Sequence, residues 1–449
     1  MKKRTFLLVA LLLVLGILLT ACGGGETNNG ANDANAGNNT NTGDNANTGN
    51  NANTGNNSGE EVAALTCDDA IGCVEIGPDD PIHVAYMLTI SGATASLGED
   101  SRGGIEIAID DRGGELLGHE IRLSGEDSGC SAEGGQAAAQ KVAADTSIVG
   151  IVGTNCSSSA EAAMTTLSGA GLVLISPSNT APRLTEQDAT KGGTWLPGYY
   201  RTAHNDLFQG RVAAEFAYNE LGARTAATIH DGSPYADGLR IVFEEVFVEL
   251  GGEVTYSGSI NVGDTDMSGV LTTVATTPPD LIYFPIFEPE GNFIAAQARE
   301  NADLAETALM GADGLLADTF PEGTGAAAVG MYLSGPAVTG DAYTAFLAQW
   351  TEKFGGTPPS GFHAHAYDAT NILLNAIEAV AQVGDDGSIL IGRQALRDAI
   401  TATANFDGLT GTLTCNATGD CATGEALAIY ELKQAEVDGN WPPEVIYTP

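Results

Sequence analysis

The sequence predicts an α/β protein with two lobes, each built on a doubly wound parallel β-sheet. In the stretch from Val149 to Arg183, two short apolar, β-branched runs bracket one alanine-rich segment of helix length. Strand-like and helix-like segments also alternate along the chain from about residue 81. The alternation restarts after Tyr199-Tyr-Arg-Thr202, which indicates a second lobe.

The order of these segments assigns the lobes. The first lobe is expected at residues 81–204 plus 337–408, with strands at 82–88, 120–125, 149–153 and 172–176 and helices at 100–111, 132–144 and 158–169. The second is expected at 205–336 plus 409–449, with strands at 225–230, 253–260, 281–285 and 329–333 and helices at 206–221, 235–250, 267–276 and 291–301. Helices at 341–354, 362–383 and 391–401 are expected to return to the first lobe, and 411–415 with 426–433 to form a hairpin on the second.

The N-terminus has the composition of a secretory signal. Lys2, Lys3 and Arg4 precede an apolar run at 6–19 that is too short for a comfortable membrane span. The run ends in Leu-Thr-Ala-Cys, which resembles the bacterial lipobox and implies cleavage before Cys22 and lipid attachment to its thiol. Residues 1–21 are therefore interpreted as a lipoprotein signal peptide, and an uncleaved anchor with an incidental cysteine is the alternative.

A lipidated cysteine and a tether follow at residues 22–59. The tether is almost entirely Gly, Asn, Thr and Ala, so it buries too little apolar surface to fold. A flexible coil of this length spans roughly 35 Å. Residues 60–80 are interpreted as a short segment looped by a disulfide. We therefore expect a protein that its N-terminal lipid holds outside the cytoplasmic membrane, at the cell surface or in the periplasm.

Acidic side chains dominate the charge, with 58 acidic against 18 basic residues and a net charge of −40. Nucleic acid and anionic lipid are poor partners for a field of this sign. The acidic residues are spread along the folded region, so we interpret them as a solvated surface. The sequence contains no nucleophile elbow, HExxH, P-loop or CxxC motif, so we expect no enzymatic activity, no cofactor and no metal site.

Six cysteines remain after Cys22, and disulfides are the default in an exported chain. Six cysteines allow fifteen pairings. Two pairs are local in sequence, Cys67 with Cys73 and Cys415 with Cys421, which leaves Cys130 to join Cys156. A bridge over a loop of that last length contributes about 3 to 4 kcal/mol.

The opening stretch also predicts where a ligand would bind. Ligands of doubly wound sheets bind beyond the carboxyl ends of the strands, and each run of this stretch ends in hydroxyl and amide side chains. Ser158-Ser-Ala-Glu161 has the form of a capping box, which would leave the free N–H groups around Ser157 for an anion such as a carboxylate. The alternative is that these serines only cap a helix and shape a turn.

Nine short motifs occur in the order of a known family. They are Leu97-Gly98, GTNCSSS at 153–159, ISPSNTAP at 175–182, Tyr200-Arg-Thr202, HDGSPY at 230–235, GDTDMS at 263–268, Gln297-Ala-Arg299, AYDA at 366–369 and FDGLTG at 406–411. Through them the chain resembles the leucine/isoleucine/valine-binding proteins of ABC importers over about 81–433. The resemblance implies the type I periplasmic-binding-protein fold, in which a multi-strand hinge joins the lobes.

The resemblance also implies a set of ligand contacts. Ser157 would hold the ligand α-carboxylate, while Ser178, Asn179 and Thr180 would complete the carboxylate contacts and receive part of the ammonium. On the second lobe, Tyr235 would close onto the ligand and Asp313 would pair with its ammonium. Packing of Tyr235 at a helix start and a turn role for Asp313 are the alternatives.

Two positions depart from the family pattern and leave the ligand side chain open. Leu97 stands where several members carry an aromatic residue, and Phe287-Glu288 replaces a tyrosine pair near the side-chain pocket. Phe287 is therefore expected in the site, and Glu288 is interpreted as a solvent-facing residue at a helix start, with a polar or cationic ligand as the alternative.

The predicted function is capture of a branched-chain or related amino acid by a monomer that delivers it to ABC permease subunits. A sensing receptor of the same fold, or a receptor for an amide, urea or small carboxylate, is the alternative.

Overall fold

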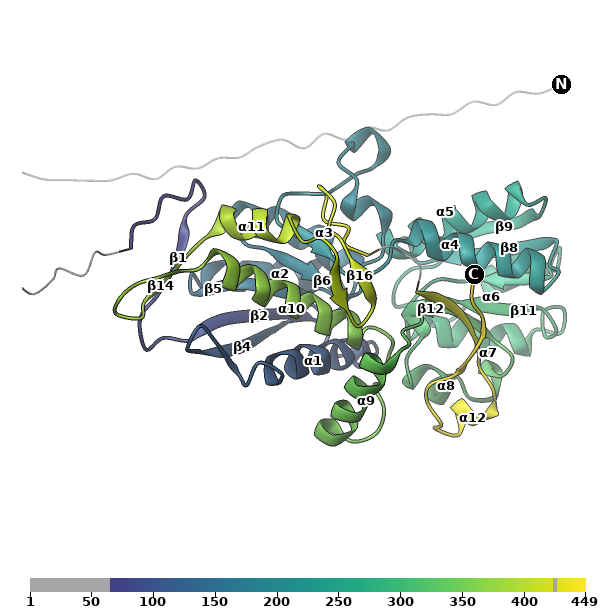
Figure 1. Cartoon of the computed structure of the whole chain (residues 1–449). Helices are drawn as coiled ribbons and strands as arrows, with labels where there is room; N and C mark the ends of the chain where they lie inside the picture. Colours follow the sequence, from purple (N-terminus) through teal and green to yellow (C-terminus); the bar gives the residue numbers. More distant parts are fainter. Residues whose placement is uncertain (1–64, 423–425) are drawn as a thin grey trace, which may run out of the picture. The chain divides into compact units, whose positions relative to one another are not determined.

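Two β-sheets of mainly parallel strands carry the fold (Figure 1). The computed structural model describes residues 65–422 and 426–449, which belong to one compact unit from Glu61 to Pro449. The predicted signal peptide, the lipidation site at Cys22 and the tether lie outside the described residues.

The first sheet has the strand order β3-β4-β2-β5-β6-β7. All neighbouring pairs are parallel except β3 with β4. The strands are β2 (Ile82–Leu88), β3 (Glu115–Leu116), β4 (His119–Asp127), β5 (Ile148–Gly153), β6 (Leu174–Ser176) and β7 (Tyr199–Arg201).

Helices cover both faces of this sheet because apolar side chains on its central strands alternate in direction. Val84 and Leu88 of β2 pack with α1, α10 and α11, whereas Ala85 and Met87 pack with α2 and α3. The helices of the first lobe are α1 (Ala95–Asp110), α2 (Ala132–Ala144), α3 (Ser157–Gly169), α9 (Asp341–Phe354), α10 (His363–Val380) and α11 (Arg393–Thr401). The predicted return of the three late helices to this lobe is confirmed.

The second sheet has the order β18-β17-β12-β11-β10-β8-β9, with its five strands from β12 to β9 parallel and the two C-terminal strands antiparallel. The strands are β8 (Thr225–His230), β9 (Glu253–Ser259), β10 (Leu281–Tyr283), β11 (Ala308–Gly311), β12 (Tyr332–Pro336), β17 (Leu427–Glu431) and β18 (Glu444–Tyr447). One continuous apolar core fills this lobe.

Along the chain, the helices of the second lobe alternate with its strands. They are α4 (Asp206–Glu215), which continues as a π-helical turn (Phe216–Glu220), and α5 (Pro234–Glu249), α6 (Ser268–Val274), α7 (Glu290–Glu300), α8 (Thr319–Thr324) and α12 (Gln434–Val437). Short 3-10 helices lie at Pro182–Thr185, Ala189–Lys191, Asp313–Leu315 and Gly325–Ala328.

The predicted C-terminal hairpin is wrong. Residues 411–415 do not pair with 426–433, because β16 (Gly411–Leu413) pairs with β15 (Phe406–Gly408) and β17 pairs with β12. Leu413 and both cysteines of the Cys415–Cys421 bridge pack in the first-lobe core. We therefore place the C-terminal part of the second lobe from Leu427 onward instead of from residue 409.

One predicted helix begins at a different residue, and two features of the fold were not predicted. Helix α1 begins five residues earlier than expected, because Gly98 belongs to its first turn: a Cβ there would lie 1.8 Å from the carbonyl oxygen of Thr89. Strand β11 was not expected, since its four residues are too short to show a period. A small sheet of β1 (Cys73–Ile76), β14 (Ile389–Gly392) and β13 (Gln382–Val383) was missed for the same reason.

The capping box predicted at Ser158 to Glu161 is also wrong. Helix α3 begins at Ser157 with Cys156 as its N-cap, and no side chain caps it. The serines make tertiary contacts instead: Ser159 Oγ donates to the carbonyl of Ser131 at 3.0 Å. Glu161 lies 3.6 Å from Arg183, so its carboxylate faces a cation and not the helix start.

All three predicted disulfides are present: Cys67–Cys73, Cys130–Cys156 and Cys415–Cys421. The middle bridge joins the turn before α2 to the N-cap of α3. It therefore fixes the backbone that presents Ser157.

We expect the Cys130–Cys156 bridge to stabilise the protein more than the Cys67–Cys73 bridge, because it closes a longer loop. By loop entropy, replacing Cys130 and Cys156 with Ser lowers the free energy of unfolding by about 3.5 kcal/mol for a separation of 26 residues, against about 2 kcal/mol for Cys67 and Cys73 at a separation of 6. Denaturant unfolding of the two double variants measures the difference. Equal losses would show that loop length does not set the contribution of these bridges.

Candidate functional site

The candidate site is formed where parallel strands of both sheets end. In the first lobe, β5 and β6 are neighbours, and Ser157 and Ser178 follow their carboxyl ends. In the second lobe, Tyr235 follows β8, Phe287 follows β10 and Asp313 follows β11, and these three strands are adjacent. Sheet order thus brings residues from five separate strand ends to one place.

These residues line one cavity between the two sheets. Its lining is Leu97, Asn155, Ser157, Ser178, Tyr235, Phe287, Asp313, Gly314 and Phe362. The cavity volume is about 10 Å³, which holds about one water molecule. Side chains of the two lobes therefore nearly meet in this structure, and a larger ligand requires them to separate.

Asn155 connects the segments that form the first-lobe wall of the cavity. It was not predicted from the sequence as a site residue. Its side chain accepts from the N–H of Thr89 at 2.9 Å and donates to the carbonyl of Leu97 at 3.0 Å and to Ser101 Oγ at 2.9 Å. It also donates to Ser178 Oγ at 3.3 Å. These bonds join the end of β2, helix α1 and the loop after β6 behind the cavity. Its position two residues after the end of β5 is the signal that could have identified it.

Ser157 is the first residue of α3, so its wall of the cavity has the partial positive charge of a helix N-terminus. Ser157 Oγ accepts from the N–H of Ala181 at 3.3 Å, which joins the two serine-bearing loops. Ser178 Oγ donates to the carbonyl of Asn155 at 3.1 Å. Hydroxyl groups and a helix N-terminus together suit a carboxylate.

The second-lobe wall is centred on the carboxylate of Asp313. Its Oδ1 accepts from Tyr235 Oη at 2.8 Å and from Gln209 Nε2 at 2.7 Å. Burial raises the pKa of Asp313 to about 6, against the opposing effect of these two donors. Tyr235 Oη also accepts from the N–H of Gly314 at 2.9 Å, so Tyr235 is fixed at both sides of its hydroxyl. The carboxylate suits an ammonium.

Asn179 and Thr180 were predicted as ligand contacts but do not line the cavity. Both are completely buried. Asn179 Oδ1 accepts from Thr154 Oγ1 at 3.1 Å and from Tyr199 Oη at 3.4 Å. Among the described residues, Asn179 Nδ2 and Thr180 Oγ1 have no hydrogen-bond partner.

Phe287 lines the cavity and packs on Tyr235, with ring centroids 4.8 Å apart. The interpretation of Glu288 as solvent-facing is wrong: its side chain is buried, and it accepts from Thr319 Oγ1 at 2.7 Å and from Asn292 Nδ2 at 3.2 Å. Burial raises the pKa of Glu288. Through these two bonds the carboxylate of Glu288 joins α7, which contains Asn292, to α8, which contains Thr319.

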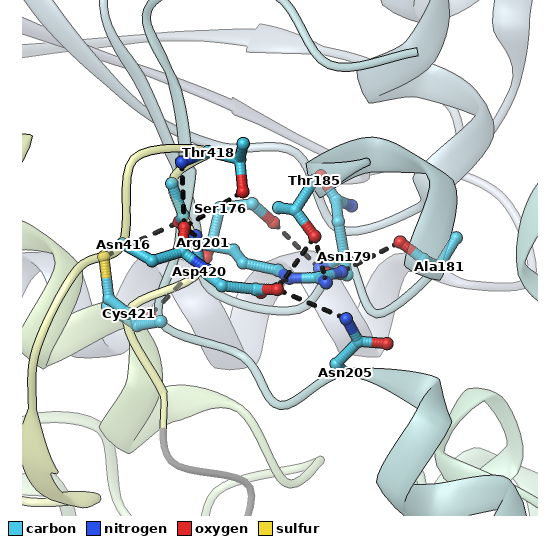
Figure 2. A network of polar contacts seen from close by, with 12 residues as sticks. Ser176, Asn179, Ala181, Thr185, Arg201, Asn205, Asn416, Thr418, Asp420 and Cys421 are labelled. Carbon is cyan, nitrogen blue, oxygen red and sulfur yellow. Dashed lines mark hydrogen bonds and ion pairs between the residues drawn. The ribbon is translucent and has the colours of Figure 1, made fainter. Parts of the chain in front are cut away.

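A buried ion pair supports the loop that carries Ser178 (Figure 2). Arg201 at the end of β7 is completely buried and bonds to Asp420, to Thr185 Oγ1 at 2.7 Å and to the carbonyls of Asn179 at 3.1 Å and Ala181 at 2.9 Å. Asp420 in turn accepts from Thr185 and from Asn205 Nδ2. Burial raises the pKa of Asp420, but Arg201 and these donors outweigh it and hold the pKa below its ordinary value.

A model of one family matches residues 81–437, and its description is periplasmic binding protein. The match covers most of the chain, so the chain belongs to this family. The fold is accordingly that of a type I periplasmic binding protein with two lobes. Over the described residues, we find no helix with the length and apolar character needed to cross a membrane.

Curated relatives and solved structures agree with this assignment. A Leu/Ile/Val-binding protein of Rhizobium johnstonii is 26% identical over 79% of this chain and 93% of its own. A crystal structure of a leucine-binding protein from Thermotoga maritima has a TM-score of 0.70 and 26% identity, covering 82% of this chain and 99% of that chain. A solute-binding protein from R. palustris in complex with benzoate shares the fold, with a TM-score of 0.66 and 22% identity over 79% of this chain and 93% of that chain.

We expect Asp420→Asn to lower the free energy of unfolding by about 3 kcal/mol at neutral pH, because it leaves the buried guanidinium of Arg201 without its counter-charge. The pKa of Asp420 is depressed in the folded protein, so its contribution is present above the ordinary pKa of 3.8 and is lost as the pH falls through the folded value. Denaturant unfolding from pH 3 to 7 should therefore show the two proteins converge toward acid.

Glu444→Gln is the matched control, since it breaks the exposed pair with Lys433. It should leave stability unchanged over the same range. A loss as large as that of Asp420→Asn would contradict a special role for the buried pair.

Proposed function

We propose that this protein captures a branched-chain or related amino acid between its two lobes and delivers it to the permease subunits of an ABC importer. The observation that carries the proposal is that one cavity has groups suited to an anion on one wall and a carboxylate suited to a cation on the other. Ser157 and Ser178, on the first lobe, face Tyr235 and Asp313 on the second. Hydroxyl groups at a helix start suit a carboxylate, and a buried carboxylate suits an ammonium.

Asp313 favours an amino acid over a carboxylate that has no ammonium. An anion such as benzoate would place its charge in an enclosure that already contains a buried acid, and this costs free energy unless the acid is neutral. Names of relatives at moderate identity also favour amino acids. Leu97 and Phe287, two positions that depart from the family pattern, line the cavity, so we extend the class to amino acids related to the branched-chain ones.

The remaining parts of the proposal concern location and partners. We propose that the chain is anchored by lipid at Cys22 outside the cytoplasmic membrane, acts as a monomer and is not an enzyme. A sensing receptor of the same fold is the second candidate for the function. Neighbouring genes for two permeases and two ATPases would support transport, and a neighbouring signalling receptor would support sensing.

A thermal-shift screen over amino acids, amides, urea and small carboxylates tests the ligand class. A ligand that binds only the folded protein raises the melting temperature by mass action. A rise with amino acids alone supports the proposal, and a rise only with amides, urea or carboxylates that lack an ammonium would refute it.

We expect Asp313→Asn to weaken binding of the best amino acid by about 2 to 4 kcal/mol, because it removes the partner of a desolvated ammonium. The des-amino analogue should lose far less. Calorimetry on both proteins with both ligands measures this. Asp368→Asn is the control, since Asp368 is also buried with a pKa raised by burial to about 6 but accepts from Leu409 and Thr410 away from the cavity. Equal losses for amino acid and analogue would mean that Asp313 only supports the fold.

Because the cavity holds about one water molecule when the lobes meet, entry of an amino acid requires an open state. Small-angle scattering should therefore show a smaller radius of gyration at saturating amino acid than in its absence. An unchanged radius would argue for a rigid cleft.

A further inference from the structure

Behind the candidate site lies a group of buried polar atoms that the proposed ligand contacts do not use. Among residues that the structure describes, five atoms there have no hydrogen-bond partner: Asn179 Nδ2, Thr180 Oγ1, Tyr283 Oη and both carboxylate oxygens of Asp206. The side chains are completely buried. The Thr180 hydroxyl is the neighbour that lowers the pKa of Asp206 most, yet burial keeps that pKa raised. A buried carboxylate with so little compensation is costly, so Asp206 is the member that most requires a function.

Two hydrogen bonds locate Asp206 relative to the site. Its N–H donates to the carbonyl of Thr180 at 3.0 Å, which places it behind the loop of Ser178. One turn later on α4, Gln209 donates to Asp313 Oδ1 at 2.7 Å. Residues three apart on a helix share a face, so the carboxylate of Asp206 is on the side of α4 that faces Asp313.

The charged and titratable groups around Asp206 provide little compensation for two negative charges. Burial raises the pKa of Asp206 well above its ordinary value, and Asp313 is the next cause. Tyr235 of α5 and Tyr283 of β10 face the two acids, and both have raised pKa values, so they are neutral donors or acceptors. The Thr180 hydroxyl and, after it, the cation Arg201 of β7 lower the pKa of Asp206, but they do not outweigh burial and Asp313. The Arg201 guanidinium is already bonded to Asp420 and Thr185.

His204, just before α4, is a neutral neighbour. Burial lowers its pKa to about 4, and its Nε2 is bonded to Gln209. Among the described groups named here, the enclosure therefore contains two acids and no cation that is free to pair with them. Two carboxylates in one low-dielectric space do not both ionise at neutral pH unless a cation joins them.

We propose that Asp206 and Asp313 form one carboxylate pair, which holds a shared proton in the ligand-free protein and exchanges it for the ammonium of the bound ligand. This rests on the proposed function, since the exchanged cation is that of the amino acid. On binding, one carboxyl O–H bond breaks and the proton passes to water or buffer. The ammonium, which pairs with Asp313 at the cavity wall, then offsets the second negative charge of the two carboxylates. Capture of an amino acid therefore releases a proton.

The first experiment needs no ligand. For a carboxyl group whose folded pKa is raised, the stabilisation is present below the unfolded pKa and is lost as the pH rises through the folded pKa. Asp206→Asn removes that penalty, so its melting temperature relative to wild type should rise between pH 5 and pH 8. A difference that stays constant with pH would overturn the shared proton, whether or not any ligand is found.

The second experiment is calorimetry with L-leucine, or with the amino acid that stabilises the protein most in the screen, in two buffers of different ionisation enthalpy. Wild type should release about one proton per ligand near neutral pH, and its affinity should rise by up to about tenfold per pH unit over the range of release. Asp206→Asn should release almost none, and its affinity should vary little with pH.

The controls separate a specific effect of Asp206 on proton release from a general effect of replacing a buried acid. Asp368→Asn, which changes a buried acid away from the cavity, should keep the full proton release. Absence of proton release from wild type, or undiminished release from Asp206→Asn, would overturn the proposal, and the wild-type measurement stands even if the variant is unstable. If no amino acid binds, the proposed function fails, while the ligand-free pH series still decides whether the pair shares a proton.

Discussion

The buried guanidinium of Arg201 is the constraint on which the arrangement of the site depends. Desolvating a charged group of this size is costly, so every element around it supplies an acceptor: the loop of Asn179 and Ala181, the short helix with Thr185, and Asp420 from the far end of the chain (Figure 2). Backbone bonds strengthen the same junction, since Arg201 donates its N–H to Gly419 and accepts from Cys421. The loop that presents Ser178 is therefore held from behind.

This junction also lies at the passage between the lobes. The chain leaves the first sheet after β7, and α4 begins five residues later at Asp206. It returns between β12 and α9 and passes to the second sheet again between β16 and β17. Because Asn205 donates to Asp420 as well, the start of α4 is fixed to the first lobe. Opening of the lobes would then change the distance between Ser157 and Asp313 more than the local geometry around Arg201.

Much of the fold could be predicted because its central strands and helices have clear periods. Strand Ile82–Leu88, helix Ala132–Ala144 and helix Asp341–Phe354 agree with prediction to the residue. The errors fall on segments whose sequence has no period of its own. Strand β11 has four residues, and the partner of Gly411–Leu413 is decided by competition between neighbouring strands. Glycine is common in loops, so Gly98 was not expected in a helix. It lies in the first turn of α1, where the backbone of Thr89 leaves no room for a Cβ.

The sequence by itself predicted the two-lobe α/β architecture from the local order of strands and helices, and the three disulfide pairs from the spacing of the cysteines. Its resemblance to the family implied five of the residues that line the cavity. The tertiary structure alone decided that Asn155 braces the cavity wall, that Glu288 and Asp206 are buried, and that Asn179 and Thr180 do not line the cavity. These are relations between side chains far apart in sequence. Their burial and their electrostatic partners exist only once the strand ends of two sheets have come together.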